Sequence, residues 1–232
     1  MIEGVICEFK KTMVIKSHNK IEKVEANYTP LSPISFLSKA AKIFPEKTSI
    51  IYESQKFSWL ETYSRCKKLA SALSNQFSNG DVIGFLAANT PELYEAHFGV
   101  PMAGMVLNAL NIRLDPETIS YIIDHSEIKI IFADDEFLEI VIKAIDISDE
   151  KPKLIRIKDK FENNSNKNFD FMDYEDFISN GDESFEPVKL MDEWDSISIN
   201  YTSGTTGKPK GVVYHQRGAY LNALGNALEW EM

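Results

Sequence analysis

The chain has 232 residues and a mass of 26.4 kDa, so it is long enough to bury a sizeable core in one or two domains. Hydrophobic residues make up 44% of it and aromatic residues 11%, a composition that excludes a disordered chain. Its formal net charge of −10, from 35 acidic and 25 basic residues, argues against general binding to nucleic acid or to an anionic membrane surface.

The N-terminal residues give little sign of regular structure. Residues 1–26 are polar and lack helical or strand periodicity, so we expect a loosely ordered extension before a domain at 27–232. This stretch lacks the apolar core of a signal peptide, and no run in the chain has transmembrane length, which makes the cytoplasm the expected location. Cys7 and Cys66 form no disulfide framework, no Cys/His cluster indicates a metal site, and Cys66 is expected to be a buried thiol.

The first part of the domain predicts two helices separated by two short strands. The first helix, 32–44, has an apolar face made of Phe36, Ala40 and Ile43. The remaining elements of this part are strands at 49–52 and 56–58, joined by a turn, and a second helix at 60–77.

Strands and helices then alternate along the chain. Residues 81–88 form a nearly continuous apolar run, which is typical of a strand buried on both faces. Thr90 and Pro91 match the N-cap and first position of the helix that follows. Further helices are predicted at 91–102, from 115, at 136–145 and at 174–178, and strands at 105–110, 129–133 and 154–157. This alternation predicts an α/β fold with a largely parallel sheet flanked by helices.

Two groups of titratable side chains on the predicted helices resemble catalytic sets. The groups are Glu92 with Glu95 and His97, and Asp124 with His125 and Glu127. Both stand beside apolar helical stripes. We therefore interpret them as solvated helix faces or helix ends rather than as sites.

The most informative segment lies near the end of the chain, where residues 201–211 read YTSGTTGKPKG. A strand with alternating apolar residues is predicted before it at 196–201, and a second short strand and a helix are predicted after it at 212–214 and 217–230. Its polar residues are Thr202, Ser203, Thr205, Thr206, Lys208 and Lys210, and its glycines are Gly204, Gly207 and Gly211. Glycines allow positive φ and close backbone approach, and successive amides form an anion-binding concavity. Hydroxyls and lysines add donors, so the segment predicts a polyphosphate site.

This segment is not a Walker A loop. That motif needs four residues between its first glycine and the Gly-Lys pair and then a helix, whereas only two residues separate Gly204 from Gly207 and a strand follows. A flexible linker is the plain alternative, but a linker rarely stands between two apolar strands. Of the two lysines, Lys210 is the better phosphate ligand, because Lys208 precedes Pro209 and is expected to face solvent.

The pattern from Thr202 to Gly211 resembles the phosphate-binding signature of the acyl-adenylate-forming (AMP-binding) superfamily, which includes acyl-CoA synthetases, aryl-CoA ligases and luciferases. The resemblance extends over about residues 27–232, through further similar segments at 26–33, 57–63, 80–86, 89–94 and 108–114. The stretches at 107–111 and 220–224 look most like medium- or short-chain fatty-acyl-CoA synthetases. The resemblance implies the N-terminal portion of the adenylate-forming enzyme fold.

The resemblance also implies ligands and a reaction. It assigns the β- and γ-phosphates of ATP to seven residues: Thr202, Ser203, Gly204, Thr205, Thr206, Gly207 and Lys210. A substrate carboxylate then gives an acyl-AMP and pyrophosphate, and coenzyme A takes the acyl group. Mg²⁺ is expected with the nucleotide. The resemblance leaves the catalytic residues of this chain unknown.

In this family an adenine-contacting segment, a ribose-binding aspartate, a hinge and a C-terminal domain with a catalytic lysine follow the loop. The sequence ends one helix after the loop, so we expect an N-terminal fragment that is inactive alone and that exposes apolar surface. The alternatives are a non-catalytic nucleotide-binding module and an inert truncation product.

Overall fold

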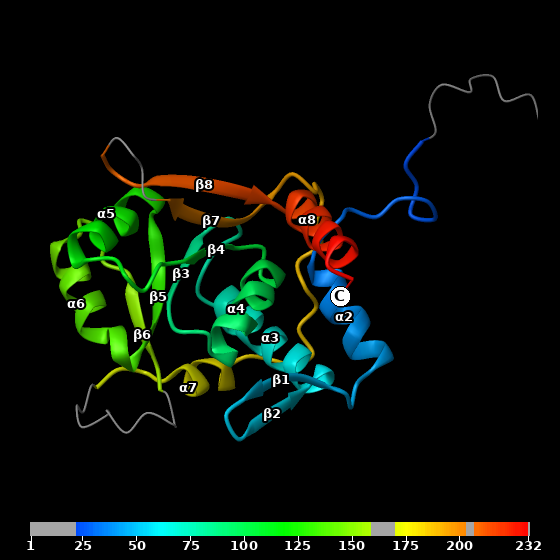
Figure 1. Ribbon diagram of the computed structural model, residues 1–232, viewed down its shortest axis with the longest axis horizontal. Helices are drawn as coiled ribbons and strands as arrows, with labels where there is room; N and C mark the ends of the chain where they lie inside the picture. The colour runs from blue at the N-terminus through cyan, green and yellow to red at the C-terminus, as the bar shows by residue number, and fades with distance from the viewer. Residues whose placement is uncertain (1–21, 159–169, 203–206, 232) are drawn as a thin grey trace, which may run out of the picture.

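The computed structural model describes residues 22–158, 170–202 and 207–231 of the protein (Figure 1). The extension predicted at 1–26 therefore lies almost entirely outside the described residues, and its described part, 22–26, is exposed and has no helix or strand. None of the described helices is both long and apolar enough to cross a lipid bilayer.

A six-stranded sheet with the order β6-β5-β3-β4-β7-β8 forms the centre of the molecule. Its strands are β3 (Val82–Leu86), β4 (Val106–Ala109), β5 (Ile128–Asp134), β6 (Lys153–Ile157), β7 (Ser196–Thr202) and β8 (Lys210–His215). All neighbours in this sheet pair in parallel except β7 and β8, which pair antiparallel. The predicted α/β fold with a largely parallel sheet is confirmed.

Helices cover both faces of this sheet and create two cores (Figure 1). The helices of one face are α2 (Ile34–Ile43), α3 (Trp59–Ser74), α4 (Pro91–Met102) and α7 (Tyr174–Ser179). The opposite face is covered by α5 (Pro116–Ser126), the short η1 (Asp135–Phe137) and α6 (Leu138–Ile147). The apolar run predicted as a buried strand is β3, where Phe85 faces the first core and Leu86 the second. A strand buried on both faces needs apolar residues at every position, which explains its continuous pattern.

A small two-stranded sheet, β1 (Thr48–Tyr52) and β2 (Gln55–Ser58), leads into α3. The Ser58 hydroxyl accepts a hydrogen bond from the Glu61 amide, and the Glu61 carboxylate accepts one from the Ser58 amide. This capping box fixes the start of α3 and holds the pKa of Glu61 below its ordinary value. Inside α3 the Cys66 side chain is fully buried, as predicted, and burial raises the pKa of its thiol.

The face of α2 differs from the apolar face that the sequence indicates. The structure buries Leu37 and Ala41, whereas Ile43 is 52% exposed. Phe36 turns instead toward the C-terminal helix α8 (Gln216–Glu229), where its ring stacks on that of Tyr220 at 4.5 Å between centroids. Helix α2 thus carries two possible apolar faces, one with Leu37 and Ala41 and the other with Phe36 and Ile43. Contacts with α3 decide that the first of them is buried.

Helix α8 follows β8 directly, and its only fully buried residue is Gln216. Leu221, Leu224 and Leu228, which fall on one face by their spacing, are exposed. The expectation that the chain exposes apolar surface is therefore confirmed, and part of that surface lies on α8.

Candidate functional site

The candidate phosphate-binding segment joins the two antiparallel strands at the edge of the sheet. The last register pair before the turn is Thr202 with Lys210, so these two residues stand opposite each other where the hairpin opens. The predicted order of two strands followed by a helix is confirmed, although β8 begins at Lys210, two residues earlier than predicted. The predicted ligands Ser203, Gly204, Thr205 and Thr206 lie outside the described residues.

The described residues at this end of the hairpin fit an anionic ligand. Thr202 and Lys210 are both exposed, and opposed side chains in an antiparallel pair have Cβ atoms about 5 Å apart, within reach of one phosphate group. Gly207 has a φ of +134°, a backbone region that a residue with a Cβ rarely adopts. Apart from its chain neighbours, no atom of the described residues lies within 4 Å of where that Cβ would be. A hydroxyl, an ammonium group and an open glycine backbone suit phosphate oxygens.

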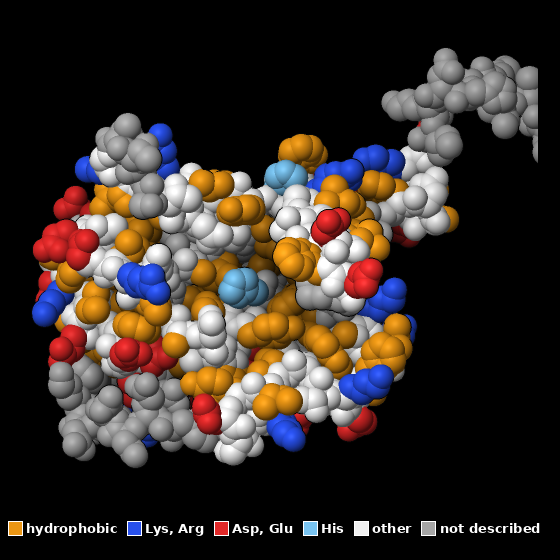
Figure 2. Space-filling model, in the orientation of Figure 1, with side chains coloured by type: hydrophobic (Ala, Val, Ile, Leu, Met, Phe, Trp, Pro, Cys, Tyr) orange, Lys and Arg blue, Asp and Glu red, His pale blue; other side chains and the backbone are white. Residues whose placement is uncertain are grey.

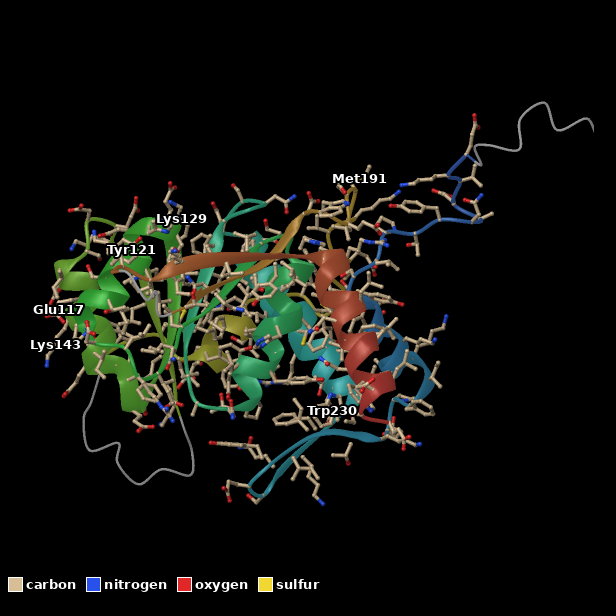
Figure 3. The ribbon with its side chains drawn as sticks, turned by 45° about the horizontal axis from the view of Figure 1, so that its top comes forward. Glu117, Tyr121, Lys129, Lys143, Met191 and Trp230 are labelled. Carbon is tan, nitrogen blue, oxygen red and sulfur yellow. The ribbon has the colours of Figure 1, made fainter. Side chains whose placement is uncertain are left out.

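The second lysine of the segment has a different neighbour. Lys208 is exposed, as predicted, but its Nζ atom stands 4.8 Å from the ring centroid of Tyr121 on α5. Figure 3 shows Tyr121 on α5 close to the hairpin. A cation–π contact of this kind holds the ammonium group against the protein. The two lysines are therefore placed differently: Lys208 against α5 and Lys210 at the opening of the hairpin.

A histidine on α5 also reaches the hairpin. The Nδ1 atom of His125 is 2.6 Å from the Tyr201 hydroxyl, and the two rings meet edge to face at 5.7 Å. Asp124 instead accepts a hydrogen bond from the Glu150 amide, and Glu127 ends α5 in a left-handed conformation with its carboxylate near Lys129. The three residues form no catalytic set, but the contact of His125 with the residue beside Thr202 was missed, because 76 residues separate the two partners.

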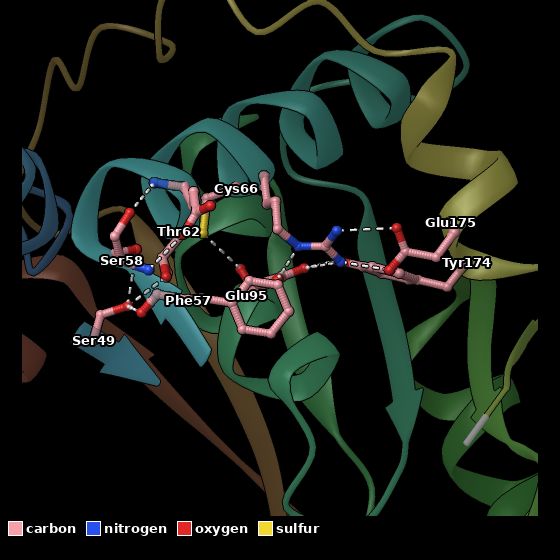
Figure 4. Close-up of polar contacts among 10 residues, drawn as sticks. Ser49, Phe57, Ser58, Thr62, Cys66, Glu95, Tyr174 and Glu175 are labelled. Atoms are coloured by element: carbon pink, nitrogen blue, oxygen red, sulfur yellow. Dashed lines mark hydrogen bonds and ion pairs between the residues drawn. The ribbon is translucent and has the colours of Figure 1, made fainter. Parts of the chain in front are cut away.

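The interpretation of Glu95 as a solvated residue is wrong. Its side chain is fully buried, and Arg65 on α3 contacts it through Nε at 2.5 Å. The Tyr174 hydroxyl donates to the same carboxylate at 2.8 Å, and Glu175 takes the other side of the guanidinium at 2.6 Å (Figure 4). Burial raises the pKa of Glu95 to about 7, against the opposing pull of Arg65.

This buried network connects α3, α4 and α7 rather than serving the hairpin. A cavity of about 300 Å³ next to it is lined by Arg65, Thr90, Glu92 and Glu175 together with residues of the small sheet. Figure 1 places α7 and the small sheet on the side of the molecule opposite to strands β7 and β8. His97 is exposed on α4, and its Nδ1 atom stands 2.7 Å from the Leu93 carbonyl oxygen. The interpretation that Glu92, Glu95 and His97 form no catalytic set therefore agrees with the structure, although Glu95 itself is buried.

Comparisons with known proteins agree with this architecture. The model of the family "AMP-binding enzyme" matches residues 37–231. The peroxisomal trans-cinnamate:CoA ligase of Petunia hybrida is 43% identical over 92% of this chain, and the peroxisomal acetate/butyrate–CoA ligase AAE7 of Arabidopsis thaliana is 42% identical over 91%. The chain spans about 40% of the length of these two relatives.

Solved structures share the fold. A long-chain-fatty-acid–CoA ligase from Archaeoglobus fulgidus superimposes with a TM-score of 0.74 at 24% identity, over 92% of this chain and 42% of that one. The inhibitor-bound N-terminal domain of FACL13 from Mycobacterium tuberculosis superimposes with a TM-score of 0.67 at 21% identity, over 80% of this chain and 44% of that domain. The described architecture is therefore that of the N-terminal domain of adenylate-forming ligases.

Proposed function

This chain belongs to the AMP-binding enzyme family, and on that premise we propose that the whole protein joins a carboxylic acid to coenzyme A at the expense of ATP. The observation that carries the proposal is the unaltered segment 202–211, which stands on an antiparallel hairpin with Thr202 opposite Lys210. Relatives named as CoA ligases, matched over nine-tenths of the chain, support it.

The proposed roles follow the order of the reaction. The β- and γ-phosphates of ATP are held by Thr202, Ser203, Gly204, Thr205, Thr206, Gly207 and Lys210. With the phosphates fixed, a substrate carboxylate oxygen attacks the α-phosphorus, and pyrophosphate leaves to give an acyl-AMP. The thiol of coenzyme A then attacks the acyl carbon and AMP leaves. Phosphoryl chemistry of this kind needs mainly positioning and charge stabilisation, which hydroxyls, amides and an ammonium group supply. Mg²⁺ would neutralise the phosphate oxygens when bound with the nucleotide.

The proposed acid is a short- or medium-chain fatty acid. Among the relatives, one is named for acetate and butyrate and another for trans-cinnamate, so an aromatic acid is the competing substrate class. Acyl-CoA formation by the whole protein, measured with butyrate, octanoate and cinnamate in parallel, separates the two. A preference for cinnamate would overturn the aliphatic assignment and leave the ligase reaction standing.

We further propose that the 232 residues alone do not complete adenylation. The test is pyrophosphate release from ATP by the purified chain with each acid, and release with any of them refutes this statement. Saturable, Mg²⁺-dependent ATP binding without turnover would identify a nucleotide-binding module. Absence of binding together with aggregation would identify an inert truncation product.

The lysine pair tests the phosphate assignment in the whole protein. We expect Lys210→Ala to lower the rate of acyl-adenylate formation by about 10²-fold, by analogy with loss of one preorganised donor to the transition state. The matched control is Lys208→Ala, which removes the same charge from the same segment and breaks the described contact with Tyr121, and we expect a milder effect. A Lys210→Ala rate within about twofold of the unchanged protein would remove this residue from the mechanism.

A cytoplasmic location is also part of the proposal, in contrast to the two relatives that are named peroxisomal. Fluorescence microscopy of the tagged whole protein with a peroxisomal marker distinguishes the two compartments.

A further inference from the structure

Helix α5 contacts the hairpin of the candidate phosphate site on both sides of its turn. On the β7 side, the Nδ1 atom of His125 stands 2.6 Å from the hydroxyl of Tyr201, the residue just before Thr202. On the β8 side, the Nζ atom of Lys208 stands 4.8 Å from the ring centroid of Tyr121. Tyr121 and His125 are about one helical turn apart, and their ring centroids are 5.3 Å apart. The two rings therefore form one contact surface for both sides of the turn.

The sheet itself gives this end of the hairpin little support. Among the described residues, β7 pairs with β4 at Ser198 and Leu107, whereas β7 and β8 stay paired as far as Thr202 and Lys210. The open end therefore extends past the pairing with the sheet, and Figure 1 shows it next to α5. Lys208 and Lys210 are exposed there, and Figure 2 shows Lys and Arg side chains at the surface of this corner. Like charges repel, so without its ligand this end needs another contact to keep its shape.

The end of α5 that presents His125 is fixed to the rest of the fold. Ile122 and Ile123 are fully buried in the second core. The Ser126 hydroxyl donates to the Ile122 carbonyl at 2.6 Å and accepts a hydrogen bond at 3.2 Å from the side chain of Asn108, a fully buried residue of β4. Residues on both sides of His125 are thus held in place, so its ring can define the position of a partner.

The Tyr201 side chain is suited to be that partner. Its ring packs against the second core, and burial raises the pKa of its hydroxyl, while a hydrogen bond with Ser126 acts in the opposite direction. The hydroxyl therefore keeps its proton at neutral pH and can donate to an imidazole nitrogen or accept from one.

We propose that His125, through the Tyr201 hydroxyl, is a positioning residue for the phosphates of ATP. It holds the open end of the hairpin against α5, so that Thr202 and Lys210 stand in place before the nucleotide binds. Donors that are ordered in advance raise affinity because the ligand does not have to order them. This inference rests on the proposed binding of ATP by the hairpin.

The test measures the Kd of Mg²⁺–ATP and the steady-state constants of acyl-CoA formation in the whole protein. For His125→Ala we expect the Kd of Mg²⁺–ATP to rise about three- to tenfold, because a hydrogen bond that orders the site is lost. Saturating ATP orders the hairpin by its own contacts, so kcat and the KM of the acid should stay within about twofold. A Kd within about twofold of the unchanged protein's, or an equal rise in the KM of the acid, would overturn the proposal.

The rescue variant is His125→Asn. Asparagine carries a hydrogen-bonding atom on Cγ, where histidine carries Nδ1, and it can donate or accept. Its Kd should return to within about twofold of the unchanged value, and this rescue should vanish when Tyr201→Phe removes the hydroxyl.

The partner variant Tyr201→Phe should raise the Kd at least as much as His125→Ala, because it also removes the hydrogen bond with Ser126. Adding His125→Ala to Tyr201→Phe should change the Kd no further. Additive effects of the two substitutions would show that His125 does not act through Tyr201, and would overturn the proposal.

The matched control is His97→Ala, which removes the same ring from an exposed position on another helix, where it contacts the Leu93 carbonyl. Its Kd should equal that of the unchanged protein, and a rise as large as that of His125→Ala would contradict the proposal. Because His125 is exposed, its variants should melt at the same temperature as the unchanged protein. If His125→Ala melts earlier, the comparison of His125→Asn with and without Tyr201→Phe decides the outcome.

The same measurements separate this inference from the proposed reaction. If the unchanged protein binds Mg²⁺–ATP but forms no acyl-CoA, the proposed reaction fails and the Kd values still decide the role of His125. Normal acyl-CoA formation with an unaltered Kd in His125→Ala overturns the positioning role alone. Absence of Mg²⁺–ATP binding by the unchanged whole protein overturns both.

Discussion

Strands β3 and β5 at the centre of the sheet bury nearly all of their residues, whereas β8 at its edge buries none. The same contrast holds for the helices that follow them: seven residues of α4 are buried and only one of α8. Yet the segment with the clearest chemical signature lies next to β8, and the central strands carry apolar residues. In this molecule the residues that hold the fold together and the residues proposed to bind phosphate occupy different regions.

This division has a physical reason. Central strands exchange side-chain contacts with helices on both faces, so each residue is constrained by many neighbours. A site for phosphates needs donors that stay accessible to the ligand, which requires exposure at Thr202 and Lys210. The two regions should therefore respond differently to substitution, and the following measurements test that difference.

The largest effect should come from the buried carboxylate. Glu95→Ala leaves the Arg65 guanidinium and the Tyr174 hydroxyl without this partner in the interior, and we expect a loss of about 3–5 kcal/mol in the free energy of unfolding. Urea denaturation of the 232-residue chain measures it. The comparison variant is Glu193→Ala near the start of α8. It breaks a 2.6 Å ion pair with Arg217, whose side chain is 41% exposed, and the loss in the free energy of unfolding should be smaller. Equal losses would remove the contrast between the regions.

Two leucines make the same comparison for packing. Leu69 on α3 is fully buried, and Leu228 on α8 is 81% exposed. Leu69→Ala should cost about 2–5 kcal/mol through lost burial and the cavity it leaves, whereas Leu228→Ala should stay within about 0.5 kcal/mol. A costly Leu228→Ala in the isolated chain would show that α8 is already packed there.

The pH dependence of stability tests the state of Glu95. Its pKa in the folded protein is about 7, against an ordinary value of 4.5, so the folded state favours the proton and this stabilising contribution is lost as pH rises from about 4.5 to about 7. Glu95→Gln has no such proton. The free energy of unfolding of the unchanged chain, taken relative to that of Glu95→Gln, should therefore fall by about 1–3 kcal/mol over this interval. A rise in this relative free energy of unfolding with pH would instead show that Arg65 keeps Glu95 ionised.

The smallest effect should come from two helical glycines. Outside its own helix backbone, no described atom lies within 4 Å of a Cβ added to Gly225 on α8. Gly225→Ala should therefore stabilise the chain by about 0.5–1 kcal/mol through helix propensity alone. A Cβ on Gly99 in α4 would approach Leu69 Cδ2 to 2.8 Å, so Gly99→Ala should destabilise it. Thermal unfolding of both variants gives the two signs, and a loss with Gly225→Ala would reveal a neighbour on α8.

The sequence predicted the regular part of the fold because its signals are local. The apolar run at 81–88 contains β3, and Thr90 with Pro91 begins α4 as predicted, although the Thr90 side chain makes no capping hydrogen bond. The strand–turn–strand order of the candidate site was equally local. It followed from alternating residues on either side of a glycine-rich stretch.

The contacts that the sequence did not reveal are long-range. Glu95 has its partners 30 and 79 residues away, at Arg65 and Tyr174, so a local pattern showed only an acid beside an apolar stripe. His125 and Tyr201 are likewise 76 residues apart. Which apolar set of α2 is buried also depends on distant helices, because periodicity fixes the helix but not its rotation about its axis.

One hydrogen bond joins the beginning of the described fold to its last helix. The Ser32 hydroxyl donates to the Gln216 side-chain oxygen at 2.7 Å, in a buried position, across 184 residues of sequence. Closing a loop of that length costs conformational entropy, and this cost must be met before the contact can stabilise the fold. We therefore expect this hydrogen bond to form late in folding. During synthesis on a ribosome the segment around Ser32 must wait until residue 216 has left the exit tunnel. Until then, the N-terminal end of α2 remains without its final partner.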